Sequence, residues 1–483
     1  MRRAEKSWSS SSVPVVPHAR TVDLEPRETP LNHIKPNPDL PTLFSYWIVA
    51  SHSCSPSIYQ SIPFNSRNNA GETHTTTTTT MRISTTTLRA GRLAQPFSPS
   101  LRQAPAVVRI NSRANSTAVD SPVNFGAAPP PPPQQQQKSG LDGKKLVADA
   151  VAATQPRNNW TKEEISAIYY QPLLELAYQA GSLHRRFHSP GEVQLCTLMN
   201  IKTGGCSEDC SYCAQSSRYS KDTGLEAKKM ESVESVLEAA RQARANGSTR
   251  FCMGAAWRDM RGRKSGLKNV VEMVKGVKAM GMEACVTLGM IDAEQARQLK
   301  DAGLTAYNHN VDTSREFYPS IISTRSYDER LTTLSHVRDA GINVCSGGIL
   351  GLGESSEDRV GLLHTVSTLP KHPESFPVNA LVPIKGTPLG DREPIAFTSM
   401  LRTIATARLL MPATIIRIAA GRKTMSEEKQ ALCFMAGANA IFTGEKMLTT
   451  ECNGWDEDSA MFGRWGLEPM QSFDKKPMDP SSA

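Results

Sequence analysis

Between Glu192 and Gly444 one pattern recurs eight times in the sequence: a short apolar run, a polar loop, and a longer stretch with apolar residues three and four positions apart. The apolar runs are predicted strands, and the longer stretches are predicted helices. Strands that alternate with helices form parallel sheets, because each helix returns the chain to the start of the next strand. The predicted strands cover 193–201, 249–255, 283–290, 305–312, 343–350, 376–383, 414–421 and 439–444.

Eight such units predict an α/β fold of the (β/α)8 TIM-type barrel class, either closed or slightly open. Three predicted helices end in the sequences KAMG, KDAG and RDAG, where the glycine suits a left-handed cap before the next strand. A doubly wound open sheet is the alternative, and it is less favoured because no G-x-G-x-x-G follows a predicted strand. In a barrel of this class the functional side chains lie at the C-terminal ends of the strands.

The part of the chain before the barrel differs in composition. It contains tracts of Thr, Pro and Gln without helical or strand periodicity, so we expect a long disordered N-terminal extension. Residues 81–118 carry six arginines and no acidic residue, which is typical of a mitochondrial presequence and predicts a mitochondrial location.

These features give the expected domain organisation. Residues 1–80 are a low-complexity extension, with the hypothesis that the working protein lacks it, and residues 119–157 are a Pro/Gln-rich linker. The barrel domain covers 158–470, with helices expected from about Val151 to Gly181 before the first strand, across its lower end. Residues 471–483 are expected to be a disordered tail.

Charge and hydropathy exclude two classes of partner. The net charge is +8, but the arginine-rich segment accounts for much of the basic excess, so we expect no nucleic acid as partner. No apolar run approaches the roughly 20 residues needed to cross a bilayer, so we expect no membrane partner. Ten cysteines without secretory features point to metal binding or catalysis rather than to a disulfide framework.

Three cysteines stand close together in the loop after the first predicted strand. The sequence TGGCSEDCSYCAQS places Cys206, Cys210 and Cys213 in a C-x3-C-x2-C array, with Tyr212 directly before the last cysteine. A structural zinc site requires four protein ligands, and disulfides require an even number of cysteines. Thiolates are the usual ligands of iron–sulfur clusters, and three of them on a four-iron cluster leave one iron open to bind a further molecule.

A second set of metal-type residues lies inside predicted strands. Cys252, Cys285 and Cys345 belong to three separate strands, and Arg417 lies on a fourth strand among isoleucines. Each cysteine alone could be a small core residue. That alternative does not explain the arginine, because burying a guanidinium without an anionic partner is costly. Three thiolates and one cation suit a buried second cluster of the 2Fe–2S type.

These motifs resemble a known family. The three-cysteine array with its aromatic residue resembles the signature of the radical S-adenosylmethionine (SAM) superfamily. From about Leu174 to Gly466, a longer series of motifs resembles the biotin synthase family in the same order. The series comprises GGCSEDCSYCAQSSRY, RFCMGAAW, EACVTLG, YNHNVDTS, VCSGGILGLGE, VPIKGTPLG and CFMAGAN.

The resemblance implies a sulfurtransferase that uses SAM-derived radicals to insert sulfur into dethiobiotin, which forms biotin in the last step of its biosynthesis. It implies that the catalytic group comprises Cys206, Cys210 and Cys213, holding a 4Fe–4S cluster, together with Arg417. It implies that Cys252, Cys285, Cys345 and Arg417 hold a 2Fe–2S cluster. The implied SAM contacts are Asn310, Asp312, Arg330 and Tyr212, and the implied dethiobiotin contacts are Asn308, Asn379, Thr449 and Thr450.

Strand alternation supports part of this assignment. Asn308, Asn310 and Asp312 are spaced by two and would share the inward face of a strand covering 305–312, with Tyr307 and His309 facing outward. The alternative is that these polar side chains cap a strand end. We interpret the other cysteines as structural or incidental: Cys54, Cys196, Cys433 and Cys452.

Partners and rivals complete the expectations. The resemblance implies a ferredoxin- or flavodoxin-type electron donor, the iron–sulfur assembly machinery and a homodimer. The nearest rival is another radical SAM enzyme, lipoyl synthase-like or maturase-like. A lipoyl synthase would bring a further N-terminal cysteine motif, and the N-terminal region here has only Cys54. A rival of another class is a non-catalytic iron–sulfur carrier, which would need neither a SAM pocket nor a barrel.

Overall fold

The computed structural model describes residues 140–471. The chain divides into two units, Met1–Ser116 and Thr117–Ala483, and all described residues belong to the second unit. The predictions for the N-terminal extension, the presequence and the tail therefore lie outside the described residues. Within them, no helix is both long enough and apolar enough to pass through a bilayer.

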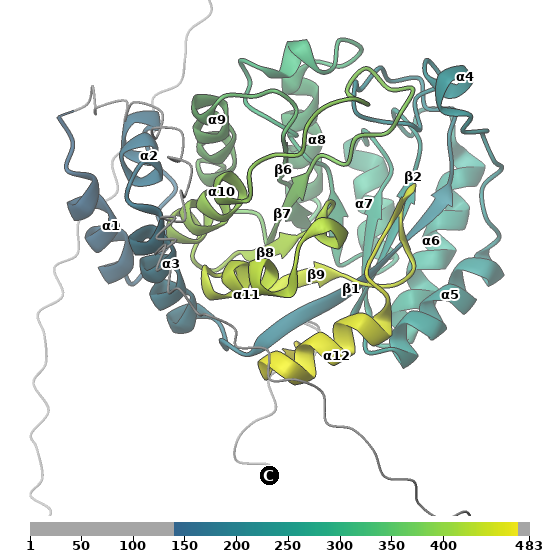
Figure 1. Ribbon diagram of the computed structural model, residues 1–483. Coiled ribbons are helices and arrows are strands. Elements are labelled where there is room, and N and C mark those ends of the chain that lie inside the picture. Colours follow the sequence, from purple (N-terminus) through teal and green to yellow (C-terminus); the bar gives the residue numbers. More distant parts are fainter. Residues whose placement is uncertain (1–139, 472–483) are drawn as a thin grey trace, which may run out of the picture. The chain divides into compact units, whose positions relative to one another are not determined.

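A closed barrel of parallel strands forms the centre of the molecule (Figure 1). The strands pair in the order β1-β2-β3-β4-β5-β7-β8-β9, and β9 pairs with β1 to close the ring. The (β/α)8 barrel predicted from the sequence is confirmed. The barrel strands are β1 (Glu192–Lys202), β2 (Arg250–Ala255), β3 (Glu283–Thr287), β4 (Ala306–Asn308), β5 (Asn343–Cys345), β6 (Gly348–Leu350), β7 (Ser375–Ala380), β8 (Ile415–Ile418) and β9 (Ala440–Phe442).

The fifth predicted strand, 343–350, is divided into the short strands β5 and β6. β5 pairs with β4 and β7, whereas β6 pairs with β7 alone. The chain bends between them at Gly347, where a Cβ atom would lie 2.0 Å from the carbonyl oxygen of Pro377. Only glycine allows the backbone to approach β7 so closely.

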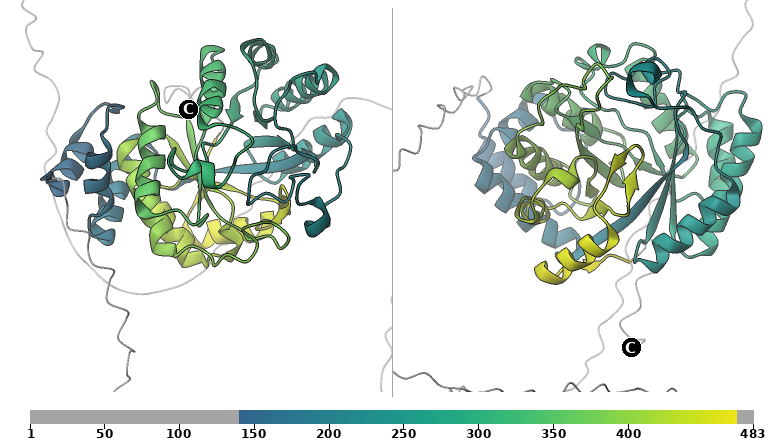
Figure 2. Two further views of the ribbon diagram at one scale, coloured as in Figure 1. Left: turned by 90° about the horizontal axis from the view of Figure 1, so that it is seen from above. Right: turned by 45° about the vertical axis from the view of Figure 1, so that its right-hand side comes forward.

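Helices surround the barrel and connect its strands (Figure 2). Three of them begin with a complete capping box, in which an N-cap residue and the N3 side chain bond each other's backbone: α7 at Asp292, α8 at Ser326 and α9 at Ser355. The surrounding helices are α5 (Val233–Ala245), α6 (Lys264–Ala279), α7 (Ala293–Asp301), α8 (Tyr327–Asp339), α9 (Ser356–Ser367), α10 (Phe397–Leu410) and α11 (Glu427–Met435).

Short elements complete the C-terminal part and the loops. β12 (Glu468–Pro469) follows α12 and pairs in parallel with the start of β1. A small hairpin, formed by β10 (Lys446–Met447) and β11 (Thr450–Glu451), extends from the loop after β9. The other elements are α4 (Ser220–Thr223), α12 (Trp455–Trp465), η1 (Tyr318–Ser320) and η2 (Arg422–Thr424).

Three helices precede the barrel: α1 (Gly143–Ala152), α2 (Lys162–Tyr169) and α3 (Leu173–Phe187). They pack mainly against the surrounding helices α9 and α10. They also reach the lower loops, where Asn158 donates to the carbonyl oxygen of Pro370 at 2.9 Å. Helix α1 falls within the predicted linker 119–157, so that prediction is too long. The helix forms because Asp142 caps it and Val147 is buried against its neighbours.

Candidate active site

One cavity of about 320 Å³ opens among the C-terminal ends of the strands and reaches down into the barrel. It collects every site residue predicted from the sequence, from the loop cysteines above to the strand cysteines below. The predicted residues that line it are Cys206, Cys210, Tyr212, Cys213, Cys252, Cys285, Asn308, Asn310, Asp312, Arg330, Cys345, Asn379, Arg417, Thr449 and Thr450.

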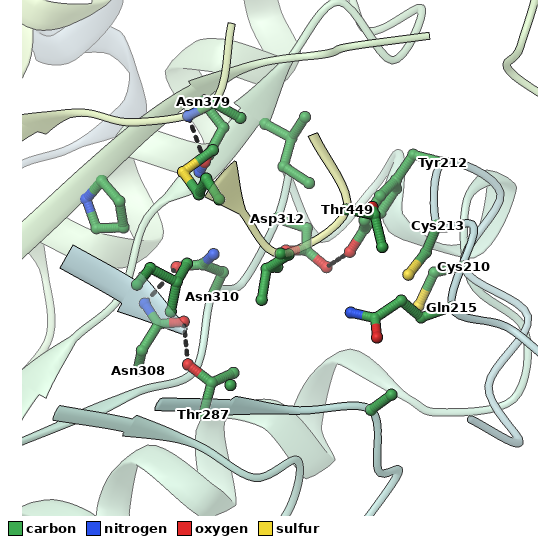
Figure 3. Close-up of a pocket in the computed structure, with 18 of the residues that line it drawn as sticks. Cys210, Tyr212, Cys213, Gln215, Thr287, Asn308, Asn310, Asp312, Asn379 and Thr449 are labelled. Carbon is green, nitrogen blue, oxygen red and sulfur yellow. Dashed lines mark hydrogen bonds between the residues drawn. The ribbon is translucent and has the colours of Figure 1, made fainter. Parts of the chain in front are cut away.

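The three-cysteine loop starts directly after β1. Gly204 and Gly205 both have positive φ, 66° and 70°, and turn the chain back over the barrel. Backbone hydrogen bonds then fold the loop on itself: the Cys213 N–H donates to the Cys210 carbonyl at 2.9 Å, and the Cys206 N–H donates to the Gln215 carbonyl at 3.0 Å. The sulfurs of Cys210 and Cys213 point into the same space (Figure 3).

A second loop, between β4 and α8, holds the cysteine loop in place. Oδ1 of Asp209 accepts from the backbone N–H groups of Ser323 at 3.0 Å and Thr324 at 3.2 Å. Burial alone would raise the pKa of Asp209, but the hydrogen bonds from Ser323 and Thr324 outweigh it and lower this pKa to about 2. Glu208 is buried between Arg325, at 3.4 Å, and Arg258, at 3.5 Å. The residues between the first two cysteines therefore anchor the loop.

The loop thiols suit a metal cluster. Burial raises the pKa of Cys206, raises the pKa of Cys213 to about 11 and raises that of Cys210 further. Such thiols stay protonated at neutral pH until a metal displaces the proton. Among residues 140–471, no three His, Cys, Asp or Glu side chains are placed to hold a single metal ion. A cluster spreads its ligands over several irons, and three thiols from one loop meet that need.

Strand β4 ends earlier than predicted. We expected a strand over 305–312, but β4 stops at Asn308, and Asp312 adopts a left-handed conformation with φ of 69°. The predicted extent of the strand is therefore wrong, although Asn310 and Asp312 both line the cavity as expected. Loop contacts hold them instead: Asn310 accepts from the Gly347 N–H at 3.2 Å, and Asp312 forms an isolated bridge to Gly348.

Asp312 is fixed by a buried ion pair. Arg330 donates to Asp312 Oδ2 at 2.5 Å, and the Tyr212 hydroxyl donates to the same oxygen at 2.9 Å (Figure 3). Nε of Arg330 also donates to the Tyr318 hydroxyl at 2.8 Å. Both charged side chains are almost fully buried, so removing either partner would leave a buried charge and cost about 3–5 kcal/mol. This geometry leaves the second carboxylate oxygen of Asp312 at the cavity.

The amide of Asn308 connects the upper and lower parts of the cavity. Its Nδ2 donates to Asn310 Oδ1 at 3.2 Å, and its Oδ1 accepts from Thr287 at 3.2 Å (Figure 3). The same Nδ2 also donates to the sulfur of Cys345 at 3.3 Å. Tyr307 is buried in the main core, in line with its expected outward direction. His309 was expected to face outward too, but it lines the cavity, because the strand alternation has ended by this position.

The opposite wall of the cavity carries the remaining predicted contacts. Asn379 uses its amide within the protein: it donates to the Gly348 carbonyl at 3.0 Å and accepts from the Ala420 N–H at 3.2 Å. Thr449 and Thr450 belong to the β10–β11 hairpin, and the Thr450 hydroxyl donates to the Met447 carbonyl at 3.0 Å. In the view of Figure 3, Thr449 is drawn beside Tyr212, between Asp312 and the loop cysteines.

The strand cysteines meet inside the barrel. Cys252 and Cys285 are register partners on β2 and β3, and Asn308 and Cys345 are register partners on β4 and β5. Cys252 and Cys285 pack together, and Cys345 lines the same cavity. The neighbouring thiols of Cys252 and Cys345 lower the pKa of Cys285 well below its ordinary value. Cys196 and then Cys285 raise the pKa of Cys252, and Cys285 raises the pKa of Cys345.

Arg417 extends from β8 into this group. It is 1% exposed, and its Nη1 donates to the sulfur of Cys196 at 2.5 Å while its Nη2 donates to Gln194 Oε1 at 2.9 Å. A second buried arginine, Arg250, pairs with Glu283 at 2.7 Å directly below. The predicted set of three cysteines and one arginine is therefore assembled in the structure, on a polar layer that the sequence analysis did not identify.

That polar layer had a signal in the sequence. Gln194 precedes Cys196 by two positions, Arg250 precedes Cys252 by two, and Glu283 precedes Cys285 by two. Residues two apart on a strand share one face, so each polar residue points into the barrel below a cysteine. Applying that period to the three strands would have found the layer, and it would have placed Cys196 on the same inward face as Gln194.

Comparisons with known proteins identify the family of the chain. Two family models match: the Radical SAM superfamily over residues 200–366, which holds the three-cysteine loop, and the Biotin and Thiamin Synthesis associated domain over residues 377–468, which holds Arg417. Solved structures with the same fold include methylornithine synthase, with a TM-score of 0.57 at 19% identity, covering 68% of this chain and 98% of that one. A FeFe-hydrogenase maturase gives a TM-score of 0.60 at 16% identity, covering 71% and 79%.

Much closer relatives exist in sequence. Over 328 residues the chain is 75% identical to the mitochondrial biotin synthase of Emericella nidulans, covering 68% of this chain and 83% of that protein. Over 333 residues it is 63% identical to the biotin synthase of Schizosaccharomyces pombe, covering 68% of this chain and 91% of that protein. With this identity, the two family models and a closed barrel around two groups of cysteines, the chain belongs to the biotin synthase family of radical SAM enzymes.

Proposed function

We propose that the chain inserts sulfur into dethiobiotin to form biotin, with SAM as co-substrate. The observation that carries this proposal is the single cavity that joins the loop cysteines to the strand cysteines and Arg417. A substrate between the two groups would reach both of them at once. A protein that used only the loop cysteines, or only the strand cysteines with Arg417, would not need the other group at the opposite end of the same cavity.

The upper group suits a 4Fe–4S cluster held by Cys206, Cys210 and Cys213, with SAM at the remaining position. When bound, this cluster and SAM supply a carbon-centred radical that removes hydrogen from unactivated carbon, which acid and base side chains cannot do. The chain's own contribution is positioning. Asp312, held by Arg330 and Tyr212, presents a carboxylate at the cavity that can accept from the ribose hydroxyls of SAM.

Two further contacts to SAM follow from the same geometry. Asn310 shares the loop with Asp312 and completes the polar edge on which SAM would lie. Arg330 keeps one N–H free on each terminal nitrogen after its bonds to Asp312 and to the Asn310 carbonyl. Those N–H groups can donate to the carboxylate of SAM.

The lower group suits a 2Fe–2S cluster held by Cys252, Cys285, Cys345 and Arg417. When bound, that cluster supplies the sulfur atom. Asn308 lies in direct contact with Cys345 and offers an amide to the ureido ring of dethiobiotin, and Asn379 orients the facing wall. We assign Thr449 and Thr450 on the hairpin to the substrate carboxylate. The Thr450 hydroxyl donates to the Met447 carbonyl at 3.0 Å and would exchange this partner for the substrate. The apolar lining from Leu198, Ile349 and Phe442 keeps water from the reacting carbon.

The proposal extends to partners and location. A radical reaction that starts with reduction of a cluster needs a one-electron donor of the ferredoxin or flavodoxin type, and two clusters need the iron–sulfur assembly machinery. We include a homodimer and a mitochondrial location. The arginine-rich residues 81–118 and the mitochondrial biotin synthases of Emericella nidulans, Saccharomyces cerevisiae and Arabidopsis thaliana support that location.

Anaerobic turnover of the reconstituted protein tests this function. With dethiobiotin, SAM and a low-potential reductant, we expect biotin and 5′-deoxyadenosine as products, both measured by mass spectrometry. Two clusters correspond to about six irons per chain, with four in one and two in the other. A reconstituted protein that cleaves SAM but never forms biotin would contradict the proposed substrate, and one that holds only four irons would contradict the second site.

Substitutions at Arg417 separate its charge from its shape. Each of its two terminal nitrogens donates a hydrogen bond within the protein, and a guanidinium rarely gives up its proton, so we expect its positive charge to contribute more than a metal–nitrogen bond. We expect Arg417→Lys to keep the 2Fe–2S cluster and activity within about 10-fold of wild type, because the charge remains. We expect Arg417→Met to lose the cluster or about 100-fold in activity, the upper end for loss of a supporting group.

The measurements for Arg417 are cluster content by visible absorbance, biotin yield and the reduction potential of the 2Fe–2S cluster. Any cluster that remains in Arg417→Met should be harder to reduce, because the added electron is no longer offset by a nearby cation. Equal loss of the cluster in both variants would show that the guanidinium nitrogen itself is indispensable.

A further inference from the structure

The inference concerns how the barrel holds Arg417. Its guanidinium contacts β1 and β9 at several points: it donates to Cys196 Sγ at 2.5 Å, to Gln194 Oε1 at 2.9 Å and to the Ile441 carbonyl at 3.4 Å. The central carbon of the guanidinium, Cζ, lies 5.1 Å from the centre of the Phe442 ring. Among residues 140–471, no carboxylate forms an ion pair with Arg417. Its closest partner is the Cys196 sulfur.

Cys196 contacts Arg417 but does not line the cavity itself. It is fully buried on β1, and it shares the inward face of the strand with Gln194. A cysteine that only filled the core would have apolar neighbours, as Cys433 does. Cys196 instead accepts from Arg417 and donates to Gln194 Oε1 at 3.7 Å. Its sulfur therefore touches Arg417, one of the four proposed ligands of the second cluster.

We propose that Cys196 is a positioning residue for the second cluster, whose sulfur fixes the plane of the Arg417 guanidinium. The inference rests on the proposed function, because it assumes that Arg417 helps to hold that cluster. Gln194 fixes one terminal nitrogen and Cys196 fixes the other, so together they set the direction in which the remaining N–H groups face. Without the sulfur, one buried N–H of Arg417 loses its acceptor, and a buried donor without a partner is unfavourable.

Two substitutions separate positioning from packing. Cys196→Ala removes the acceptor and leaves nearly the same shape, whereas Cys196→Ser keeps an oxygen acceptor for Arg417. A residue needed only for packing would tolerate alanine at least as well as serine, because serine brings a polar group into the site. A positioning residue reverses that order. Cys433→Ala is the matched control, since it removes a buried thiol that does not line the cavity.

The readout is the rate at which the reconstituted full-length protein loses its 2Fe–2S absorbance in the presence of an iron chelator. Loss of a group that orients a metal ligand typically weakens a metal site 10–100-fold, so we expect Cys196→Ala to lose the cluster about 10-fold faster than wild type. Cys196→Ser should stay within about 3-fold of wild type, since it keeps an acceptor. Cys433→Ala and the 4Fe–4S content of every variant should be unchanged.

Two outcomes overturn the inference and are distinguishable from failure of the proposed function. If wild type holds the second cluster and Cys196→Ala loses it at the wild-type rate, Cys196 does not position Arg417. If serine loses the cluster as fast as alanine or faster, the thiol acts through packing alone. If wild-type protein holds no second cluster under any reconstitution, both the proposed function and this inference fail.

Discussion

Cys210→Ala should abolish SAM cleavage, with 5′-deoxyadenosine formation falling by more than about 100-fold, since loss of a supporting residue alone already costs 10–100-fold. The loop supplies only three thiols to its proposed cluster, so the variant keeps two protein ligands on four irons. Cys210 is also the best buried of the three, and its carbonyl accepts the hydrogen bond that places Cys213. The substitution therefore removes one proposed ligand and is expected to disturb the position of Cys213, a second proposed ligand.

The measurement for Cys210→Ala is 5′-deoxyadenosine formed under anaerobic, reducing conditions, together with the visible spectrum of the 4Fe–4S cluster. Cys433→Ala is the control for loss of a buried thiol and should cleave SAM at the wild-type rate. Cleavage at the wild-type rate by Cys210→Ala would remove the loop from the active site. Cys206→Ala and Cys213→Ala should behave like Cys210→Ala.

Cys285→Ala should separate the two halves of the chemistry. Cys285 is the central member of the strand group, in contact with Cys252 on one side and Cys345 on the other. Its loss should prevent assembly of the 2Fe–2S cluster and lower biotin formation by more than about 100-fold, again beyond the effect of losing a supporting residue. The loop cysteines lie on a different element, so the variant should still assemble the 4Fe–4S cluster and cleave SAM.

Iron content and products of one preparation test Cys285→Ala. We expect about four irons per chain instead of about six, with 5′-deoxyadenosine still formed and biotin absent. Cys252→Ala and Cys345→Ala should give the same pattern. Biotin at the wild-type yield from Cys285→Ala would show that this thiol only packs the barrel interior.

The fold could be predicted because each strand–helix unit has a recognisable local sequence pattern. The strands and helices of the barrel have different hydrophobic periods, and the order of the eight units leaves little choice of architecture. The ends of the elements were less predictable. Strand β4 stops at Asn308 and β5 is separated from β6 at Gly347, because tertiary contacts with β7 and the left-handed Asp312 override the pattern of side chains.

The site was predictable where residue type alone implies chemistry. Cysteines at the end of β1 and an arginine on an apolar strand stand out in the sequence. Asn379 was harder: its amide is bonded to Gly348 and Ala420 across strand ends, and such contacts exist only after the barrel closes. The contact of Cys196 with Arg417 could not be predicted for the same reason, because β8 brings Arg417 to it from more than two hundred positions away.

Because β9 closes the barrel on β1, the two proposed cluster sites become complete at different stages of synthesis. The ribosome releases the chain from the N-terminus, so a nascent chain that has reached β4 already contains every ligand proposed for the first cluster. It still lacks Cys345 and Arg417, two of the four proposed for the second. Gln194 and Cys196 are synthesised early, on the first strand, whereas Arg417, which donates hydrogen bonds to both, is synthesised near the end of translation. The shallow cluster site can therefore be complete well before the deep one, and the deep site becomes complete only as the last strands dock.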